Sequence, residues 1–327
     1  METIGTPWMW AGFFAFVAAA TAIDLKVFSG AGAERVRVGA ALAWSAFWVL
    51  LALGFAAWLW WHLAGSAGPG LAREKTLEFL TGYLIEKSLS VDNIFVFLML
   101  FTYFAVPATL QRHALAVGVL GAIALRIVMI LLGAWLIARF HWILYLFGAF
   151  LLVTGAKMLF MAGKPPDVGA NPLLGWMRGH LPLTDAYRGA RYWVRENGAR
   201  VFTPLFLVIV MIGVTDLVFA VDSIPAIFAV TSDPFIVMTS NIFAVLGLRA
   251  LYFVLADMAA RFHLLGYGLA LVLLFIGAKM LLVDLVKIPV LLALAVVAAL
   301  IASSIVASLL RPQRALRAAL APGEAGK

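Results

Sequence analysis

Apolar residues fill this chain in long runs, and short polar or charged stretches separate one run from the next. A helix rises about 1.5 Å per residue, so roughly 20 apolar residues are enough to cross the ~30 Å hydrocarbon layer of a membrane. Runs of about that length cover residues 7–27, 38–61, 78–104, 114–137, 142–161, 202–228, 236–256, 265–283 and 288–310. The pattern therefore predicts an all-α polytopic membrane protein with about nine transmembrane helices.

Composition supports the membrane class, since 65% of the 327 residues are hydrophobic whereas soluble domains are roughly half apolar. The chain has no cysteine, which excludes disulfides, thiolate metal ligands and thiol redox chemistry. The first apolar run lacks a preceding basic region and ends in Asp24-Leu-Lys26 instead of a small-residue cleavage site. We therefore expect a retained membrane span there and not a removed signal peptide.

The net charge of +8 is explained by membrane topology. If the N-terminus lies outside, 15 of the 24 Lys and Arg residues fall in cytoplasmic segments, 4 fall in outer loops and 5 fall within spans. Cytoplasmic loops of membrane proteins carry such an excess of basic residues. The distribution predicts an outer N-terminus and a cytoplasmic C-terminus, and it gives no reason to expect a nucleic-acid partner.

Two tetrapeptides recur at an offset of 122 residues, which indicates an internal repeat. Ala138-Arg-Phe-His141 returns at 260–263, and Gly155-Ala-Lys-Met158 returns at 277–280. Each copy holds three predicted spans, 78–161 in the first copy and 202–283 in the second. An odd number of spans makes the second copy start from the opposite side of the membrane, so the prediction is two inverted three-helix repeats, as in many secondary transporters.

The remaining segments frame these repeats. Residues 1–77 are predicted to form two N-terminal bracing helices, and 284–310 a ninth transmembrane helix. Residues 162–201 form a cytoplasmic loop whose basic stretch, Ala186–Arg200, looks helical. That stretch could lie along the inner leaflet, or the loop could be a solvated tether between the repeats. The basic tail 311–327 is expected to be disordered and cytoplasmic.

Two matching acidic pairs carry the functional signal. Glu86 and Asp92 lie six residues apart in the third run, and Asp216 and Asp222 lie six apart in the sixth. A charge at bilayer depth costs at least a few kcal/mol, and helix packing alone does not require carboxylates. We interpret the pairs as a duplicated element that handles an ion.

The midpoints of the two runs place Asp92 and Asp216 near the bilayer midplane, with Glu86 and Asp222 about two turns further out. The acids can then form two rungs, Asp92 with Asp216 and Glu86 with Asp222. The amide and hydroxyl oxygens of nearby Asn93, Thr215, Ser223 and Asn241 would complete the site. Oxygen ligands without Cys or clustered His suit Mg²⁺, Ca²⁺ or Mn²⁺. The predicted metal-site residues are Glu86, Asp92, Asn93, Asp216, Asp222, Ser223 and Asn241.

Basic residues inside the spans allow two interpretations. Arg126 and Arg249 occupy corresponding mid-span positions. Each either balances a buried carboxylate or competes with the metal for it. Lys87 follows Glu86 and is expected to pair elsewhere, and Lys157 and Lys279 can extend to the interface. Asp24, near the end of its run, is expected at the interface.

No phosphate-binding glycine loop, nucleophile elbow or HExxH motif occurs, so neither an enzyme nor an ATP-driven pump is expected, and no resident cofactor is implied. An intramembrane carboxylate enzyme is the weakest alternative, because no substrate motif accompanies the acids.

Three segments together resemble the TerC/Alx family of integral membrane proteins. They are Glu86–Asn93 (EKSLSVDN), Asp216–Pro225 (DLVFAVDSIP) and Ser240–Tyr252 (SNIFAVLGLRALY), and the likeness extends over roughly residues 5–310. The resemblance implies a fold related to LysE-type transporters, a place in the bacterial inner membrane, and Mn²⁺ efflux.

The expected function is therefore a secondary transporter that exports a divalent cation, Mn²⁺ above others, with proton import as a candidate coupling. Its expected partners are the metal ion and membrane lipid. The family was also named for tellurium resistance, and its plant relatives are linked to membrane-protein biogenesis. An assembly or metalation scaffold, or a tellurite-resistance factor without transport, stays open as an alternative.

Overall fold

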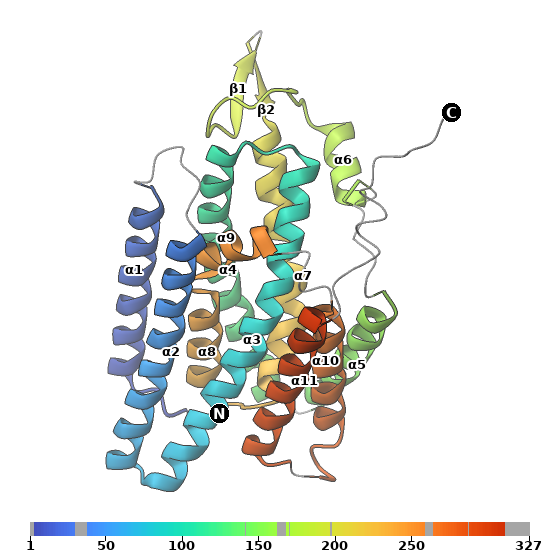
Figure 1. The fold of residues 1–327 in the computed structure, drawn as a ribbon. Coiled ribbons are helices and arrows are strands. Elements are labelled where there is room, and N and C mark those ends of the chain that lie inside the picture. The colour runs from blue at the N-terminus through green and yellow to red at the C-terminus, as the bar shows by residue number, and fades with distance from the viewer. Residues whose placement is uncertain are drawn as a thin grey trace.

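The computed structural model of the protein describes residues 3–29, 38–140, 142–161, 168–169, 171–196, 198–258, 264–286 and 288–310, and these are nearly all helical (Figure 1). The helices are α1 (Pro7–Ser29), α2 (Val38–Ser66), α3 (Pro69–Tyr103), α4 (Ala108–Arg139), α5 (Ile143–Met161), α6 (Pro172–His180), α7 (Pro204–Phe228), α8 (Pro234–Val245), α9 (Leu248–Met258), α10 (Leu265–Leu281) and α11 (Val290–Leu310). The strands are β1 (Trp193–Glu196) and β2 (Ala199–Phe202).

Six of the described helices are long and apolar enough to cross a membrane, namely α1, α2, α4, α5, α7 and α11. The pair α8 and α9, bent by 42° at its break, makes a seventh candidate span. Helix α3 has 35 residues but carries several charges between Arg73 and Asp92, and α10 has only 17 residues. The structure thus confirms a helical, multi-pass protein with six to seven candidate spans, while the count of nine stays a prediction.

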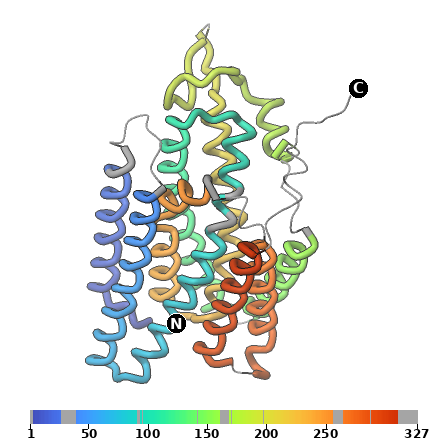
Figure 2. Tube along the Cα trace, in the orientation of Figure 1, coloured from blue at the N-terminus to red at the C-terminus, as the bar shows by residue number. Residues whose placement is uncertain are grey.

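Helices α3, α4, α7 and α8 form the centre of the bundle. Helix α3 packs against α2, α7 and α8, and α4 packs against α7 and α8. Helices α1 and α2 line one side of this centre, and α5, α10 and α11 line the other (Figure 1). The trace runs along α8 and then turns across the bundle in α9 (Figure 2). The interior faces of four helices therefore meet where the predicted polar residues lie.

Helices α5 and α10 touch through glycines. A Cβ atom on Gly155 would lie 3.0 Å from the carbonyl oxygen of Ala270, and one on Gly277 would lie 2.9 Å from that of Gly148. The repeat offset of 122 residues relates Gly155 to Gly277 and Gly148 to Ala270. The two contacts are thus reciprocal, as in a two-fold interface.

The prediction of a helix over Ala186–Arg200 is wrong, because β1 and β2 form an antiparallel hairpin there. Gly198 has φ 81°, the left-handed conformation that glycine adopts readily in a two-residue hairpin turn. The Asn-Gly sequence at 197–198 was the signal for this hairpin in the sequence.

The Tyr187 hydroxyl donates to the carbonyl of Phe104 at 2.8 Å. Burial raises the pKa of Tyr187 to about 12, so this phenol remains a donor at neutral pH. The segment is thereby tied to the end of α3.

Candidate intramembrane polar site

Glu86 lies at the centre of the site and is fully buried on α3. Its Oε1 pairs with the guanidinium of Arg126 and accepts a hydrogen bond from the Ser90 hydroxyl at 3.4 Å. Ser90 shares the face of Glu86 because residues four apart are stacked on a helix. The other carboxylate oxygen, Glu86 Oε2, accepts a hydrogen bond from Asn241 Nδ2 at 3.3 Å. The carboxylate therefore has partners on both oxygens.

Arg126, which is 1% exposed, connects four helices. From α4 it pairs with Glu86 of α3, donates to Asn241 Oδ1 of α8 at 2.8 Å, and lies 3.9 Å from Asp216 Oδ1 of α7. One buried cation thus contacts two of the four acids singled out in the sequence. Removing one charge from a buried ion pair leaves the other charge buried and uncompensated. Each residue of this cluster is therefore stabilised in place by the others.

A small cavity of about 40 Å³ adjoins this pair, which is enough room for water or a small ion. Its polar lining comes from Glu86, Asn93, Arg126, Asp222 and Ser223, and its apolar lining from Leu89, Met158, Phe219 and Leu273. Glu86 and Asp222 therefore face a common space.

Asp222 is half-buried on α7 and is held from α5. The Thr154 hydroxyl is hydrogen-bonded to its carboxylate, and Lys157, one turn further on, interacts with it electrostatically. The sequence predicted only an interfacial role for this lysine. The Lys157 side chain is exposed, so its ammonium group can be hydrated while it interacts with the Asp222 carboxylate.

Three buried side-chain oxygens near this cavity have no hydrogen-bond partner among the described residues. They belong to Asn93 (Oδ1), Asp216 (Oδ2) and Ser223 (Oγ). A buried acceptor without a partner costs about 1–3 kcal/mol, and three such oxygens close to one cavity favour a ligand or water there. Carboxylate, amide and hydroxyl oxygens are the donor types that hard divalent cations prefer.

Within the described part of the chain, no group of three or more His, Cys, Asp or Glu side chains stands ready to hold a metal ion. Arg126 is one physical reason, because its guanidinium lies between Glu86 and Asp216. Asp92 belongs to α3, but its side chain lies outside the described residues. The predicted rung of Asp92 with Asp216 therefore stays a prediction. Thr215 is half-buried beside Asp216.

The partner of Arg249 is an acid outside the two acidic pairs. Arg249 pairs with Asp24 of α1 at 3.1 Å, and the Trp44 indole donates to the same carboxylate at 3.1 Å. Asp24 is only 6% exposed, so it is enclosed by protein, while the expectation that it lies at the depth of the membrane interface stays a prediction. Arg249 thus balances an acid of the N-terminal helices, and the sequence pattern alone gives no link between that acid and the repeats.

These features define a multi-pass integral membrane protein with a charged polar site buried among its helices. The chain belongs to the integral membrane protein TerC family, whose family model matches residues 71–316. The match begins in α3, so α1 and α2 lie outside it. The family resemblance seen in the three sequence segments is thereby confirmed.

Relatives from several bacteria share this region. The chain is 54% identical over 227 residues to the "Putative membrane-bound redox modulator Alx" of Escherichia coli strain K12, covering 69% of this chain and 71% of the relative. It is 48% identical over 230 residues to the "Uncharacterized membrane protein STKORF319" of Myxococcus xanthus, covering 69% of each. An "Uncharacterized membrane protein" of Rickettsia bellii is 37% identical over 218 residues, covering 67% of this chain and 69% of the relative. No solved structure matches the chain.

Proposed function

We propose that this protein is a secondary transporter of the bacterial inner membrane that exports a divalent metal cation, with Mn²⁺ as the leading substrate. One observation carries the proposal. Glu86 and Asp216 are buried on either side of Arg126, next to a cavity lined by Asp222, Asn93 and Ser223. Ionisable groups at such depth mark ion pathways more often than structural contacts.

Charge balance favours a divalent ion. If the predicted fourth acid Asp92 is counted with Glu86, Asp216 and Asp222, the ionised site carries four negative charges, and Arg126 and Lys157 carry two positive charges, which leaves two to be neutralised. One divalent cation does this without a counter-ion. Donors of this kind bind Mg²⁺, Ca²⁺ and Mn²⁺, and Mn²⁺ is preferred here because the family resemblance points to it.

Exchange between Arg126 and the metal ion gives a mechanism for binding and releasing the metal. In the observed arrangement the Arg126 guanidinium occupies the position between the acids that a metal ion would take. An arriving cation would displace Arg126 from Glu86, and departure of the metal would let the ion pair form again. Asn241 Oδ1, which accepts from Arg126 at 2.8 Å, would then become available as a ligand.

Reciprocal packing supports the inverted repeat that such a transporter needs. Cβ atoms on Gly82 of α3 and Gly118 of α4 would lie 2.8 Å from Ser240 Oγ and 2.9 Å from Ile212 Cγ2, respectively. The acidic-pair offset of 130 relates Gly82 to Ile212, and the Arg126–Arg249 offset of 123 relates Gly118 to Asn241, the residue next to Ser240, so the two contacts are reciprocal to within one residue. Together with the reciprocal glycine contacts of α5 and α10, this supports a two-fold relation between 78–161 and 202–283.

The name of the Escherichia coli relative refers to redox modulation, which this chain cannot perform through thiols because it has no cysteine. A change in metal content would be an indirect route to such an effect. A scaffold or tellurite-resistance factor without transport predicts a phenotype that survives neutralisation of the acids.

A deletion strain of the source bacterium tests the proposal. It is challenged separately with Mn²⁺, Ca²⁺, Mg²⁺ and tellurite, and complemented with wild type or Asp216→Asn. Hypersensitivity and cellular accumulation specific to Mn²⁺, corrected only by wild type, are expected. Full correction by Asp216→Asn, or sensitivity to tellurite alone, would count against transport.

A further inference from the structure

The break between α8 and α9 lies beside the polar site. Helix α8 ends at Val245 and α9 begins at Leu248, with a 42° bend between them. Gly247 has φ 83°, and a Cβ atom there would lie 2.5 Å from Cδ1 of the buried Trp48. The last carbonyls of a helix lack intrahelical partners, so the break presents backbone oxygens inside the bundle.

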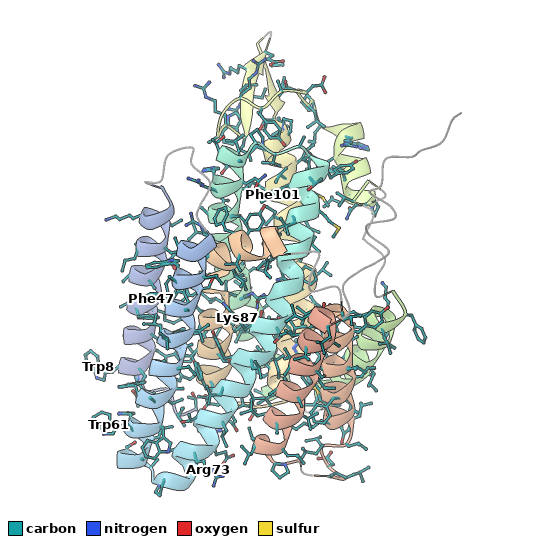
Figure 3. The ribbon with its side chains drawn as sticks, in the orientation of Figure 1. Trp8, Phe47, Trp61, Arg73, Lys87 and Phe101 are labelled. Atoms are coloured by element: carbon teal, nitrogen blue, oxygen red, sulfur yellow. The ribbon has the colours of Figure 1, made fainter. Side chains whose placement is uncertain are left out.

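The ammonium group of Lys87 occupies those oxygens. Its Nζ donates to the carbonyls of Ala244 at 3.1 Å and Leu246 at 3.3 Å. Lys87 is at mid-height of the bundle on α3, the helix that packs against α8 (Figure 3). Within the described part of the chain, the hydrogen bonds of this lysine go to the end of a broken helix.

Lys87 and Glu86 are neighbours on α3, and both form hydrogen bonds with α8 or its C-terminal end. Successive residues are about 100° apart around a helix, so the two side chains leave α3 in different directions. Glu86 accepts from Asn241, and Lys87 reaches the end of the same helix, one turn beyond. The position of Asn241 relative to Glu86 and Arg126 therefore depends on where the end of α8 is held.

The Lys87 contact uses carbonyls that the break in the helix leaves open. If α8 and α9 joined into one continuous helix, the carbonyls of Ala244 and Leu246 would each accept a backbone amide one turn further on, and the ammonium would have to share them. Carbonyls at the ends of broken membrane helices are a recurrent cation site in transporters. An ammonium with three donors satisfies the same oxygens.

We propose that the carbonyls of Ala244 and Leu246 form a cation-binding cradle that the Lys87 ammonium fills, and that Lys87 is a positioning residue that holds Asn241 against Glu86 and Arg126. The cradle is inferred from the two hydrogen bonds of Lys87 with the carbonyls of Ala244 and Leu246. The effect of Lys87 on transport rests on the proposed function.

Chemical rescue tests the cradle in purified protein. Lys87→Ala leaves space for n-propylammonium, which restores the missing part of the side chain. We expect this ion to raise the melting temperature of Lys87→Ala in a saturable way, since a ligand that binds only the native state stabilises it. It should not do so for wild type or for Lys75→Ala, a control on α3 whose ammonium contacts Glu78 at 2.9 Å. Equal effects of n-propanol, or equal effects on all three proteins, would overturn the cradle.

Transport of Mn²⁺ in proteoliposomes tests positioning. Lys87→Ala should lower the maximal rate by about tenfold or more, the usual scale for a lost hydrogen bond to a charged group. Lys87→Arg or added n-propylammonium should restore much of the rate, which a residue needed only for folding would not allow. Lys87→Met is the second variant, because methionine fills the volume of the lysine side chain without its charge. Wild-type activity of Lys87→Met would refute the proposal. If wild type moves no Mn²⁺, the transport proposal fails, whereas the thermal measurement still decides on the cradle.

Discussion

At the scale of single residues, Arg126 is the group on which the arrangement of the buried site depends. It contacts two carboxylates and one amide, each from a different helix. The sequence motifs identified Glu86, Asp216, Asn241 and Arg126 correctly as buried polar positions. Their pairing could not be read from spacing, because it depends on which helix faces meet.

Replacing Arg126 tests this dependence. Arg126→Met should destabilise the folded protein by about 3–5 kcal/mol, because it leaves the buried Glu86 charge without a partner. The double variant Glu86→Gln with Arg126→Met should recover much of that loss. Unfolding in detergent measures both. A single variant as stable as wild type would show that Arg126 does not compensate the acids.

The buried pair of Asp24 and Arg249 gives a second residue-scale prediction. Asp24→Asn should lower the free energy of unfolding by about 3 kcal/mol, since both side chains are nearly fully buried. Glu196→Gln is the matched control. Its exposed pair with Arg188 should contribute less than about 1 kcal/mol. Similar losses in both variants would contradict the assignment of Asp24 to the interior.

At the scale of elements, apolar runs predicted the long helices but not the break or the hairpin. Residues 236–256 are apolar on both sides of Gly247, so hydropathy treats them as one span. The break depends on the conformation of Gly247 and on oxygens that Lys87 satisfies from another helix. The hairpin had a local signal in Asn-Gly, which the basic and aromatic pattern around it obscured.

Gly247 offers a test of the break. Gly247→Ala should destabilise the protein by about 2–4 kcal/mol, because positive φ strains a residue with a Cβ and that atom would collide with Trp48. Gly121→Ala, in α4 with nothing near its added Cβ, should be neutral or stabilising by about 0.5–1 kcal/mol. Thermal unfolding of both in the same detergent provides the comparison. Equal tolerance at both glycines would mean that the break is not built into the fold.

At the scale of the whole molecule, composition and hydropathy sufficed to predict a helical multi-pass membrane protein, and three sequence segments carried the resemblance to the TerC family. They could not establish the number of spans, because α3 is charged along much of its length and α10 is short. The predicted inverted repeat has its sequence support in the recurring tetrapeptides. Its strongest structural support, the reciprocal glycine contacts, appears only when the helices are packed.

Orientation in the membrane can be tested directly because the chain has no native cysteine. A cysteine at Ala67, in the turn between α2 and α3, should react with a membrane-impermeant maleimide added to cells whose outer membrane has been opened. A cysteine at Ala199, in the hairpin, should react only after the inner membrane is permeabilised. The cysteine-free parent sets the background. The reverse pattern would place the N-terminus in the cytoplasm and contradict the charge distribution.

The most direct test of the central claim is uptake of radioactive manganese into inverted inner-membrane vesicles, in which cytoplasmic surfaces face outward. Wild-type vesicles should accumulate Mn²⁺ above vesicles lacking the protein, and Asp92→Asn and Asp216→Asn should each abolish the difference at equal protein levels. No metal-specific accumulation by wild type, or full accumulation by both variants, would contradict export through the buried acidic site.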